Sequence, residues 1–294
     1  MTDTLDSLRR KVDSATELGS VVRTMKALAA ASVMQYEHAV AALDDYYRTV
    51  EMGLVCCLRQ TGVAWGAERK PRGREVSVAA VVFGSDQGLD GGFNEALADF
   101  AARALGRMPG AKEVLVVGER AQSYLADAGV AAASSFAAPN AIAAVTALVG
   151  PLLLRLQGYR EQGRADEVWL FHNRSRPGKV YEPEAVRLLP LDAEWQAGLA
   201  RQPWPASNLP EVVGAGEATL QALVREYLFI SLYRACAVSL ASENASRLAA
   251  MQRAEKNIGE LMEDLGSAFR ALRQSAIDEE LFDVVSGFEA LKNE

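Results

Sequence analysis

The most constraining feature of this sequence is where its prolines lie. All ten occur between Pro71 and Pro210, so the first 70 and the last 84 of the 294 residues contain none. A proline inside a helix removes a backbone hydrogen bond and clashes with the preceding turn, at a cost of about 3 kcal/mol. Both proline-free flanks are rich in Ala, Leu, Arg and Glu. The sequence therefore predicts two long helices that bracket a compact middle part.

The amino-terminal flank carries an apolar residue at nearly every third or fourth position from Leu5 to Cys57, a period of 3.5 residues. Only Gly19 and Lys26 interrupt this stripe. A heptad period sustained over about 55 residues is typical of a coiled-coil seam, and it predicts a rod of roughly 80 Å. Lys26 has two interpretations: its stem covers the seam while its ammonium group reaches water, or that group meets an acidic surface on a partner.

The carboxy-terminal flank repeats this pattern from Leu220 to Leu272 and continues it one residue out of phase from Ile277 onward. A helix of about 75 residues measures roughly 110 Å, so it would extend about 30 Å beyond the first helix. The projecting end carries these apolar residues: Ile277, Leu281, Val284, Val285 and Phe288. A lone soluble helix does not keep such a surface exposed without a partner. In the alternative interpretation, the helix breaks near Gly259 or Gly266 and folds back.

The middle part has a different periodicity. Apolar runs rich in β-branched residues alternate with helical patterns, in the order 76–83, 93–105, 114–117, 119–128 and 167–172. Strands that are apolar on both faces and alternate with helices indicate a mainly parallel sheet covered by helices. The sequence therefore predicts a central α/β domain between two coiled-coil helices, with boundaries at 1–62, 75–208 and 211–294.

A glycine-rich turn follows the first predicted strand and invites a nucleotide-binding interpretation. Its glycines do not form G-x-G-x-x-G, and no Gly-Lys-Ser/Thr follows them. Asp86 and Asp90 would also place negative charge beside any phosphate. We therefore predict a structural turn. The alternative is a nucleotide-binding oxidoreductase in which Glu119, after the second strand, would bind a ribose.

Composition and motifs exclude several other classes. The net charge of -7 argues against a nucleic acid partner, because phosphate binding needs clustered Lys and Arg. Cys56, Cys57 and Cys236 lack metal-ligand spacing and are predicted to be buried thiols. His38 and His172 have no nucleophile motif nearby, and we expect His172 at a strand end, partly buried. We expect no catalytic, cofactor or metal site. We also expect no transmembrane segment, because no apolar run reaches about 18 residues.

Segments in all three parts resemble motifs of one family. Residues 85–94, S-D-Q-G-L-D-G-G-F-N, are similar to T/S-D-R-G-L-C-G-G-L-N. Residues 23–32, R-T-M-K-A-L-A-A-A-S, are similar to K-A-M-x-M-V-A-A-S-K. Residues 242–251, S-E-N-A-S-R-L-A-A-M, are similar to S-E-x-A-A-R-M-x-A-M, and residues 273–287 to R-Q-A-x-I-T-x-E-L-x-E-I-V-x-G-A. These motifs belong to the gamma subunit of rotary F-type ATP synthases, which the chain resembles from end to end.

The sequence also departs from that family at several positions. Gln87 replaces the usual Arg, Asp90 the usual Cys, Asp278 the usual Thr and Phe288 the usual Ala. The basic cluster that normally follows the first helical motif is missing as well. In these respects the chain resembles a divergent branch, similar to the gamma subunits of alternative bacterial ATPases that move sodium ions or protons.

The resemblance implies both a fold and a function. The fold would be an antiparallel pair of terminal helices, a coiled coil, with an inserted Rossmann-like α/β domain. The chain would be the non-catalytic central rotor shaft, one copy per complex, turning inside three alpha and three beta subunits. Its α/β domain would contact the epsilon subunit and the membrane c-ring, so that ion-driven rotation is coupled to ATP synthesis or hydrolysis. We expect it at the cytoplasmic face of the bacterial inner membrane, as a peripheral subunit.

The resemblance also implies contact residues for the beta subunits: Arg23, Met25, Lys26, Arg247, Arg273, Gln274 and Asp278. Arg273 and Gln274 would hydrogen-bond loops near the helix tip, and Arg247 would make a second contact of this kind. The three residues of the first helix would face the moving carboxy-terminal domains. Outside this family, a coiled-coil scaffold unrelated to rotation would also fit the two long helices.

Overall fold

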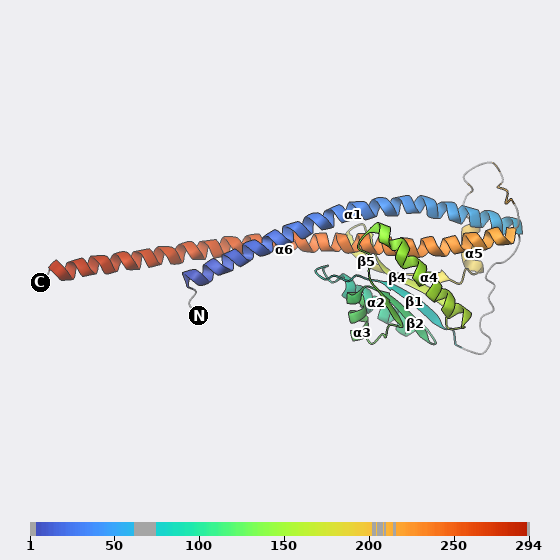
Figure 1. Cartoon of the computed structure of the whole chain (residues 1–294), viewed down its shortest axis with the longest axis horizontal. Helices are drawn as coiled ribbons and strands as arrows, with labels where there is room; N and C mark the ends of the chain where they lie inside the picture. The colour runs from blue at the N-terminus through green and yellow to red at the C-terminus, as the bar shows by residue number, and fades with distance from the viewer. Residues whose placement is uncertain are drawn as a thin grey trace. The chain divides into compact units, whose positions relative to one another are not determined.

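Helices account for most of the chain in the computed structural model, which describes residues 4–61, 75–201, 204, 208, 210–213 and 216–292 (Figure 1). The two longest are α1, Leu5–Thr61 with 57 residues, and α6, Gly216–Lys292 with 77 residues. The two predicted long helices are therefore confirmed. The predicted seam position Phe288 and the predicted limits at residues 1, 62 and 294 lie outside the described side chains.

Among the residues that the structure describes between α1 and α6, there are ten shorter elements. Their bounds are β1 Val78–Phe83, α2 Phe93–Arg107, β2 Lys112–Val117, α3 Glu119–Asp127, β3 Ser134–Phe136, the 3-10 turn η1 Ile142–Ala144, α4 Val145–Glu161, β4 Glu167–Arg176, β5 Lys179–Leu189 and α5 Ala193–Ala200. The chain divides into two compact units: residues 29–247, and the two helix ends up to Leu28 and from Leu248 onward. We call the first the sheet unit and the second the helix-end unit.

The sheet unit is built on five strands in the order β3-β2-β1-β4-β5. The pairs within β3-β2-β1-β4 are parallel, and only β5 runs antiparallel, against β4. Every residue of the central strand β1 is buried. A run of six apolar residues in β1 fits this position, because a central parallel strand is covered on both faces. The predicted mainly parallel α/β sheet is confirmed.

Alternate residues of β1 enter two separate hydrophobic cores. Val78, Ala80 and Val82 pack with the buried faces of α2 and α3. Ala79 and Val81 belong to the larger core, which also takes in α4 and the parts of α1 and α6 in the sheet unit. The long helices are therefore covering layers of the sheet as well as partners of each other (Figure 1).

The predicted seams of both long helices face inward. Every stripe position of α1 from Leu5 to Cys57 is buried or half-buried, including Gly19 and Lys26. On α6 the same holds for the predicted stripe from Leu220 to Leu272. In the sheet unit, polar contacts join the helices beside this seam, since Arg234 Nε donates to Asp44 at 2.7 Å.

The helix-end unit tests the alternative in which the carboxy-terminal helix folds back. Helix α6 is continuous through both Gly259 and Gly266, so that alternative is wrong. Val22 of α1 packs there with Met251 and Ile258 of α6. Burial ends at Leu272, because every described side chain from 273 to 286 is exposed. The remaining residues to the end of the helix correspond to about 30 Å, in agreement with the predicted projection.

Several elements of the sheet unit were missed or misplaced by the sequence interpretation. The third predicted strand, 167–172, is too short, because β4 continues to Arg176. His172 therefore lies within a strand and is buried, whereas we expected it at a strand end and partly buried. Strand β5 was not predicted, since charged residues and Pro183 interrupt its apolar pattern. Proline is tolerated there because β5 is an edge strand.

Helix α4 was also not predicted. The stretch Ile142–Glu161 is long and apolar enough to cross a membrane by length and composition alone, with a mean hydropathy of 1.4. We did not expect such a segment from the sequence. In the structure this helix packs on the sheet, with Val149, Leu152 and Leu156 in the larger core. One third of its apolar window is buried, and Arg160 lies in its last turn.

Two glycines give a first test of this architecture. Gly259 lies on α6 with no atom within 4 Å of an added Cβ, so Gly259→Ala is expected to stabilise the helix by about 0.5–1 kcal/mol. Gly84 differs, because an added Cβ would lie 2.2 Å from Cβ of Ala121. Gly84→Ala is therefore expected to destabilise the full chain by about 1–3 kcal/mol. Urea unfolding followed by circular dichroism measures both, and two equal effects would contradict the packing described.

Candidate functional site

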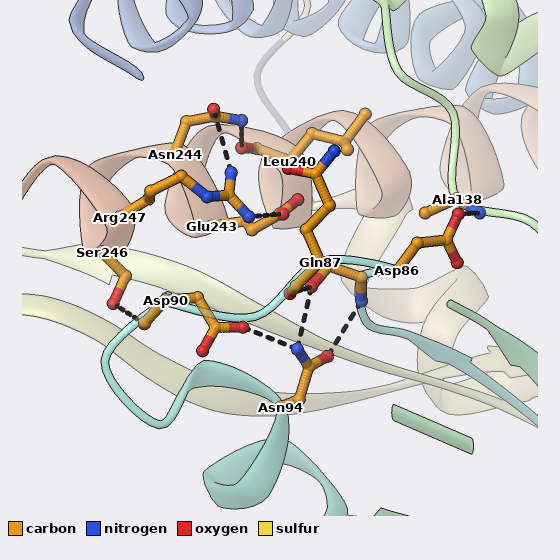
Figure 2. A network of polar contacts seen from close by, with 11 residues as sticks. Asp86, Gln87, Asp90, Asn94, Ala138, Leu240, Glu243, Asn244, Ser246 and Arg247 are labelled. Carbon is orange, nitrogen blue, oxygen red and sulfur yellow. Dashed lines mark hydrogen bonds and ion pairs between the residues drawn. The ribbon is translucent and has the colours of Figure 1, made fainter. Parts of the chain in front are cut away.

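Polar side chains gather where the glycine turn after β1 meets α6. We call this set the polar joint. It consists of Ser85, Asp86, Asp90, Asn94, Glu243, Ser246 and Arg247, and Figure 2 labels all of these except Ser85. The first four come from the turn and the start of α2, and the last three from α6. All belong to the sheet unit, and all except Asp86 are buried.

Asn94 holds the turn together from inside. Its Oδ1 accepts a hydrogen bond from the backbone N–H of Ser85 at 2.9 Å. Its Nδ2 donates to Ser85 Oγ at 2.8 Å and to Asp90 Oδ2 at 2.6 Å. Because Asn94 is 2% exposed, its amide group needs partners inside the protein, and these three hydrogen bonds supply them. The amide thus fixes both ends of the turn to the first turn of α2.

Asp86 ties the same turn to α3. Its Oδ1 accepts from the backbone N–H of Glu119 at 2.8 Å, and its Oδ2 accepts from that of Ala138 at 3.0 Å. Glu119 is the first residue of α3, so the carboxylate occupies the amino-terminal end of that helix, where the helix dipole favours a negative charge. The position for an anion at the start of α3 is therefore filled by a carboxylate of the same chain.

Two glycines, Gly84 at the start of the turn and Gly118 after β2, allow close packing. A Cβ on Gly84 would meet Ala121, and a Cβ on Gly118 would lie 2.5 Å from the backbone N of Ser85. Gly118 also has a φ of 103°, which favours glycine. The geometry agrees with the predicted structural turn, because the close contacts at Gly84 and the bonds of Asp86 are made to other atoms of the same chain. In the described parts of the chain, no three His, Cys, Asp or Glu side chains group closely enough to hold a metal ion.

The α6 side of the joint contains a buried ion pair. Arg247 Nη2 donates to Glu243 Oε1, and both side chains are less than one tenth exposed. Burial raises the pKa of Glu243, although Arg247 and a hydrogen bond from Ser85 act in the opposite direction. The same carboxyl raises the pKa of Tyr36 on α1, after burial, which is the main cause. The ion pair therefore lies where α1, α6 and the glycine turn meet.

The predicted contact residues fall into three places. In the helix-end unit, Arg23 is exposed, Met25 packs against the cluster around Met251, and Lys26 forms an ion pair with Glu255 of α6. The acidic partner of Lys26 is thus supplied by this chain. The Lys26 side chain is 35% exposed, so its stem covers the seam while its ammonium group is paired with Glu255.

The other four predicted contact residues lie on α6. Arg273, Gln274 and Asp278 are exposed on the projecting end. Arg247 differs from them, because it is buried in the sheet unit and paired with Glu243. The structure therefore brings together three residues on α1 and three at the end of α6, and leaves Arg247 apart from both sets.

Sequence interpretation missed the α6 residues that contact the sheet. Ser239 Oγ donates to the carbonyl of Phe83 at 2.6 Å, and Ser246 Oγ donates to the carbonyl of Asp90. Ser242 Oγ lies 3.3 Å from Ser175 Oγ of β4. The available signal was the spacing of these serines, i, i+3 and i+7, within a stretch that is otherwise rich in Ala and Leu. That spacing places all three on one helix face.

His172 is a second buried polar group on the sheet face that carries the larger core. It is 6% exposed, and its Nδ1 has no hydrogen-bond partner. Burial lowers its pKa from 6.5 to about 4, and the positive charges of Arg174 and Arg234 act in the same direction. The imidazole is therefore neutral at physiological pH, which removes it as a general acid or base near pH 7.

Comparison with known proteins gives one family and one fold. A family model described as ATP synthase matches residues 4–291, which is nearly the whole chain. A chain of the Euglena gracilis mitochondrial ATP synthase, in an OSCP/F1/c-ring structure, has a TM-score of 0.67 at 15% identity, covering 98% of this chain and 94% of that chain. A chain of the Tetrahymena thermophila mitochondrial ATP synthase central stalk and c-ring has a TM-score of 0.56 at 22% identity, covering 80% and 99%.

A third structure, the rotor of the Euglena gracilis mitochondrial ATP synthase, has a TM-score of 0.56 at 14% identity, with 93% of this chain and 98% of that chain covered. At these identities the structural matches show a shared fold. The family match rests on the sequence itself and extends through both long helices and the sheet between them.

The buried ion pair can be tested by comparing a single variant with a double variant. Arg247→Met is expected to destabilise the full chain by about 3–5 kcal/mol, because it leaves the Glu243 carboxylate buried without its cation. Glu243→Gln combined with Arg247→Met should cost clearly less than Arg247→Met alone, since no buried charge remains. Urea unfolding at pH 7 gives both values. If the double variant were the less stable of the two, the pair would not be coupled as the structure shows.

The neutral state of His172 predicts a pH dependence of stability. Its folded pKa of about 4 lies below its ordinary value of 6.5, so the unfolded chain binds more protons within that window. The contribution of neutral His172 to the free energy of unfolding is fully present above pH 6.5 and is lost as the pH falls toward 4. Between pH 7 and pH 5 the loss is about 2 kcal/mol. His172→Gln should remove this part of the dependence. Identical slopes for the two proteins would contradict the assignment.

Proposed function

The chain belongs to the family of gamma subunits of F-type ATP synthases, the non-catalytic central rotor shaft, and from this premise we propose which of its surfaces carry rotation. The helix-end unit would turn inside a ring of alpha and beta subunits. The sheet unit would contact the epsilon subunit and the membrane c-ring. One copy per complex would then couple ion movement to ATP synthesis or hydrolysis at the beta subunits.

This arrangement is supported by the structures that share the fold, which are described as central stalk, c-ring and rotor of mitochondrial ATP synthases. The chain is a peripheral component of the F1 stalk. We propose that it works at the cytoplasmic face of a bacterial inner membrane, in the divergent branch of alternative sodium- or proton-moving ATPases. The departures at Gln87, Asp90 and Asp278 support that branch.

The observation that carries the proposal is the exposed end of α6. Five large apolar side chains are exposed there: Ile277, Leu281, Phe282, Val284 and Val285. Phe282 alone is 74% exposed. Contiguous apolar surface of this kind marks a site of protein interaction. A ring of alpha and beta subunits that encloses the end of the shaft would remove this surface from water.

Charged and polar residues beside the apolar end would make the specific contacts. Arg273 and Gln274 directly follow Leu272, the last half-buried seam position, so both project beyond the seam. Arg is suited to such a contact, because its planar donor fork can pair with a carboxylate in two places. Arg23 and Met25 on α1 would meet the moving carboxy-terminal domains of the beta subunits.

The remaining three predicted contacts have different surroundings. The ammonium group of Lys26 is paired with Glu255, so a contact with a beta subunit would have to share that group. Arg247 is buried and paired with Glu243, so a beta subunit would contact it only if the surrounding chain moved and uncovered the pair. Asp278, where the family usually has Thr, adds a negative charge at the tip. That carboxylate would repel an acidic loop and shift the contact toward Arg273.

The contact role of Arg273 and Gln274 can be tested in the assembled complex. Losing one charge-assisted hydrogen bond costs about 1.5–3 kcal/mol, which corresponds to roughly tenfold to hundredfold in rate if that step limits turnover. We therefore expect Arg273→Ala with Gln274→Leu to slow ATP hydrolysis without changing subunit composition. Turnover of the purified complex is the measurement.

The same helix offers a matched control. Gln252 and Arg253 are neighbouring residues of the same two types, and both are exposed. Gln252→Leu with Arg253→Ala removes the same groups away from the tip, so it separates a contact at the tip from a general loss of charge. Unaltered hydrolysis in an intact complex carrying the Arg273 and Gln274 changes would reject the contact role. Loss of the complex would mark the pair as needed for assembly instead.

A further inference from the structure

Three serines of α6 connect that helix to the carboxyl ends of two neighbouring strands. Ser239 donates to the backbone oxygen of Phe83, the last residue of β1, at 2.6 Å. Ser246 donates to the backbone oxygen of Asp90 in the following turn. Ser242, between them, lies 3.3 Å from the hydroxyl of Ser175 on β4. Ser239, Ser242 and Ser246 are all buried.

The spacing of these serines fixes the helix in two directions. Ser239 and Ser246 are seven residues apart, about 10 Å along the axis, so the helix cannot slide without breaking both bonds. A hydroxyl oxygen lies about 4 Å from the axis of a helix that is about 10 Å wide, so a rotation of about 20° would move it by more than about 1 Å. Such a shift takes a hydrogen bond out of its normal range of about 2.5–3.0 Å.

The groups that receive these bonds are themselves immobilised. The Asp90 side chain accepts a hydrogen bond from Asn94. Phe83 is the last residue of a strand that is buried along its whole length. Asp86 fastens the same turn to α3 and to the segment after β3. On the helix side, Ser246 adjoins the buried Arg247, which is paired with Glu243 (Figure 2). A force applied to the sheet therefore reaches α6 through stiff connections.

We propose that Ser239, Ser242 and Ser246 form a torsional lock, through which torque passes between the sheet and the shaft helix α6. This inference rests on the proposed function, in which the sheet unit contacts the membrane ring and the helix ends contact the beta subunits. Under that arrangement, torque must cross the contact between the sheet and the long helices. The serines are positioning residues, because they touch neither nucleotide nor ion.

Apolar packing alone would serve this purpose less well. The hydrophobic effect is non-directional, so a helix can rotate between similar packings at small cost. Hydrogen bonds weaken steeply when their angle is lost, so the bonds from Ser239 and Ser246 to the carbonyls of Phe83 and Asp90 resist a rotation of the helix. Small residues in this stretch, including Ala237 and Ala241, allow the close approach that the short serine side chain needs.

The test uses the assembled, membrane-bound complex with Ser239→Ala and Ser246→Ala, both singly and together. Each lost hydrogen bond is expected to weaken the engaged state of the joint by about fivefold to tenfold. We expect ATP hydrolysis to continue while the number of ions pumped per ATP falls, most strongly in the double variant. Pumping is measured in vesicles beside hydrolysis, at a temperature well below that at which the variant unfolds. Should the double variant fail to assemble, the single variants decide.

Ser231→Ala is the matched control. Ser231 lies on the same helix, and its hydroxyl oxygen is buried without a hydrogen-bond partner among the described residues. This variant should pump as well as the unmodified complex, whereas a purely structural role for the buried serines would lower stability without changing ions per ATP. A coupling ratio equal to that of Ser231→Ala in every lock variant would overturn the proposal.

The outcome can be separated from a failure of the proposed function. If the Arg273 and Gln274 variant slows hydrolysis while the lock variants pump normally, the chain is the shaft but the serines are not its lock. If neither set of variants changes hydrolysis or pumping, the assignment of the shaft surfaces is itself wrong.

Discussion

The structure depends on the close approach of α6 to the carboxyl ends of β1 and β4. A helix that lies directly on strand ends covers backbone carbonyls that would otherwise be hydrated, and each buried carbonyl needs a donor. Serine is the residue that meets this demand, because it is small enough for close packing and still carries a donor. Ser239 and Ser246 supply these donors, and they thereby place the glycine turn and, through Asn94 and Asp86, the first turns of α2 and α3.

A second constraint follows from the length of α6. One continuous helix passes through two environments: its side chains are mostly buried between 235 and 247, and they are exposed from 273 to 286. Within the buried stretch, polar residues are satisfied by the chain itself, as the Glu243–Arg247 pair illustrates. In the exposed stretch, apolar residues such as Phe282 have no cover from this chain in the part that the structure describes. The first stretch explains the fold, and the second requires other subunits.

Much of this could be predicted from the sequence because it follows from periodicity. The seams of α1 and α6, their different lengths, and the parallel sheet all arise from repeated apolar positions that any such chain must bury. The alternating pattern of apolar residues did not predict β5 or α4, because Pro183 and Pro151 interrupt it. Pro183 is tolerated because β5 is an edge strand. His172 was misplaced because the end of a strand depends on its neighbour, and β5 extends the pairing of β4 to Arg176.

The polar joint could be predicted from the sequence even less completely than the fold. Motif resemblance marked the glycine turn and the segment 242–251 separately, but only the fold shows that Ser246 of the second segment donates to Asp90 of the first. Ser246 and Asp90 are 156 positions apart in the sequence, so the contact between the two motifs could not be predicted from the neighbouring residues of either one. Each segment supplies one side of the same buried hydrogen bond, so a substitution in either segment removes a partner that the other segment uses. A rotor needs such joints in addition to stiff helices, since a rod transmits torque only as far as its weakest connection allows.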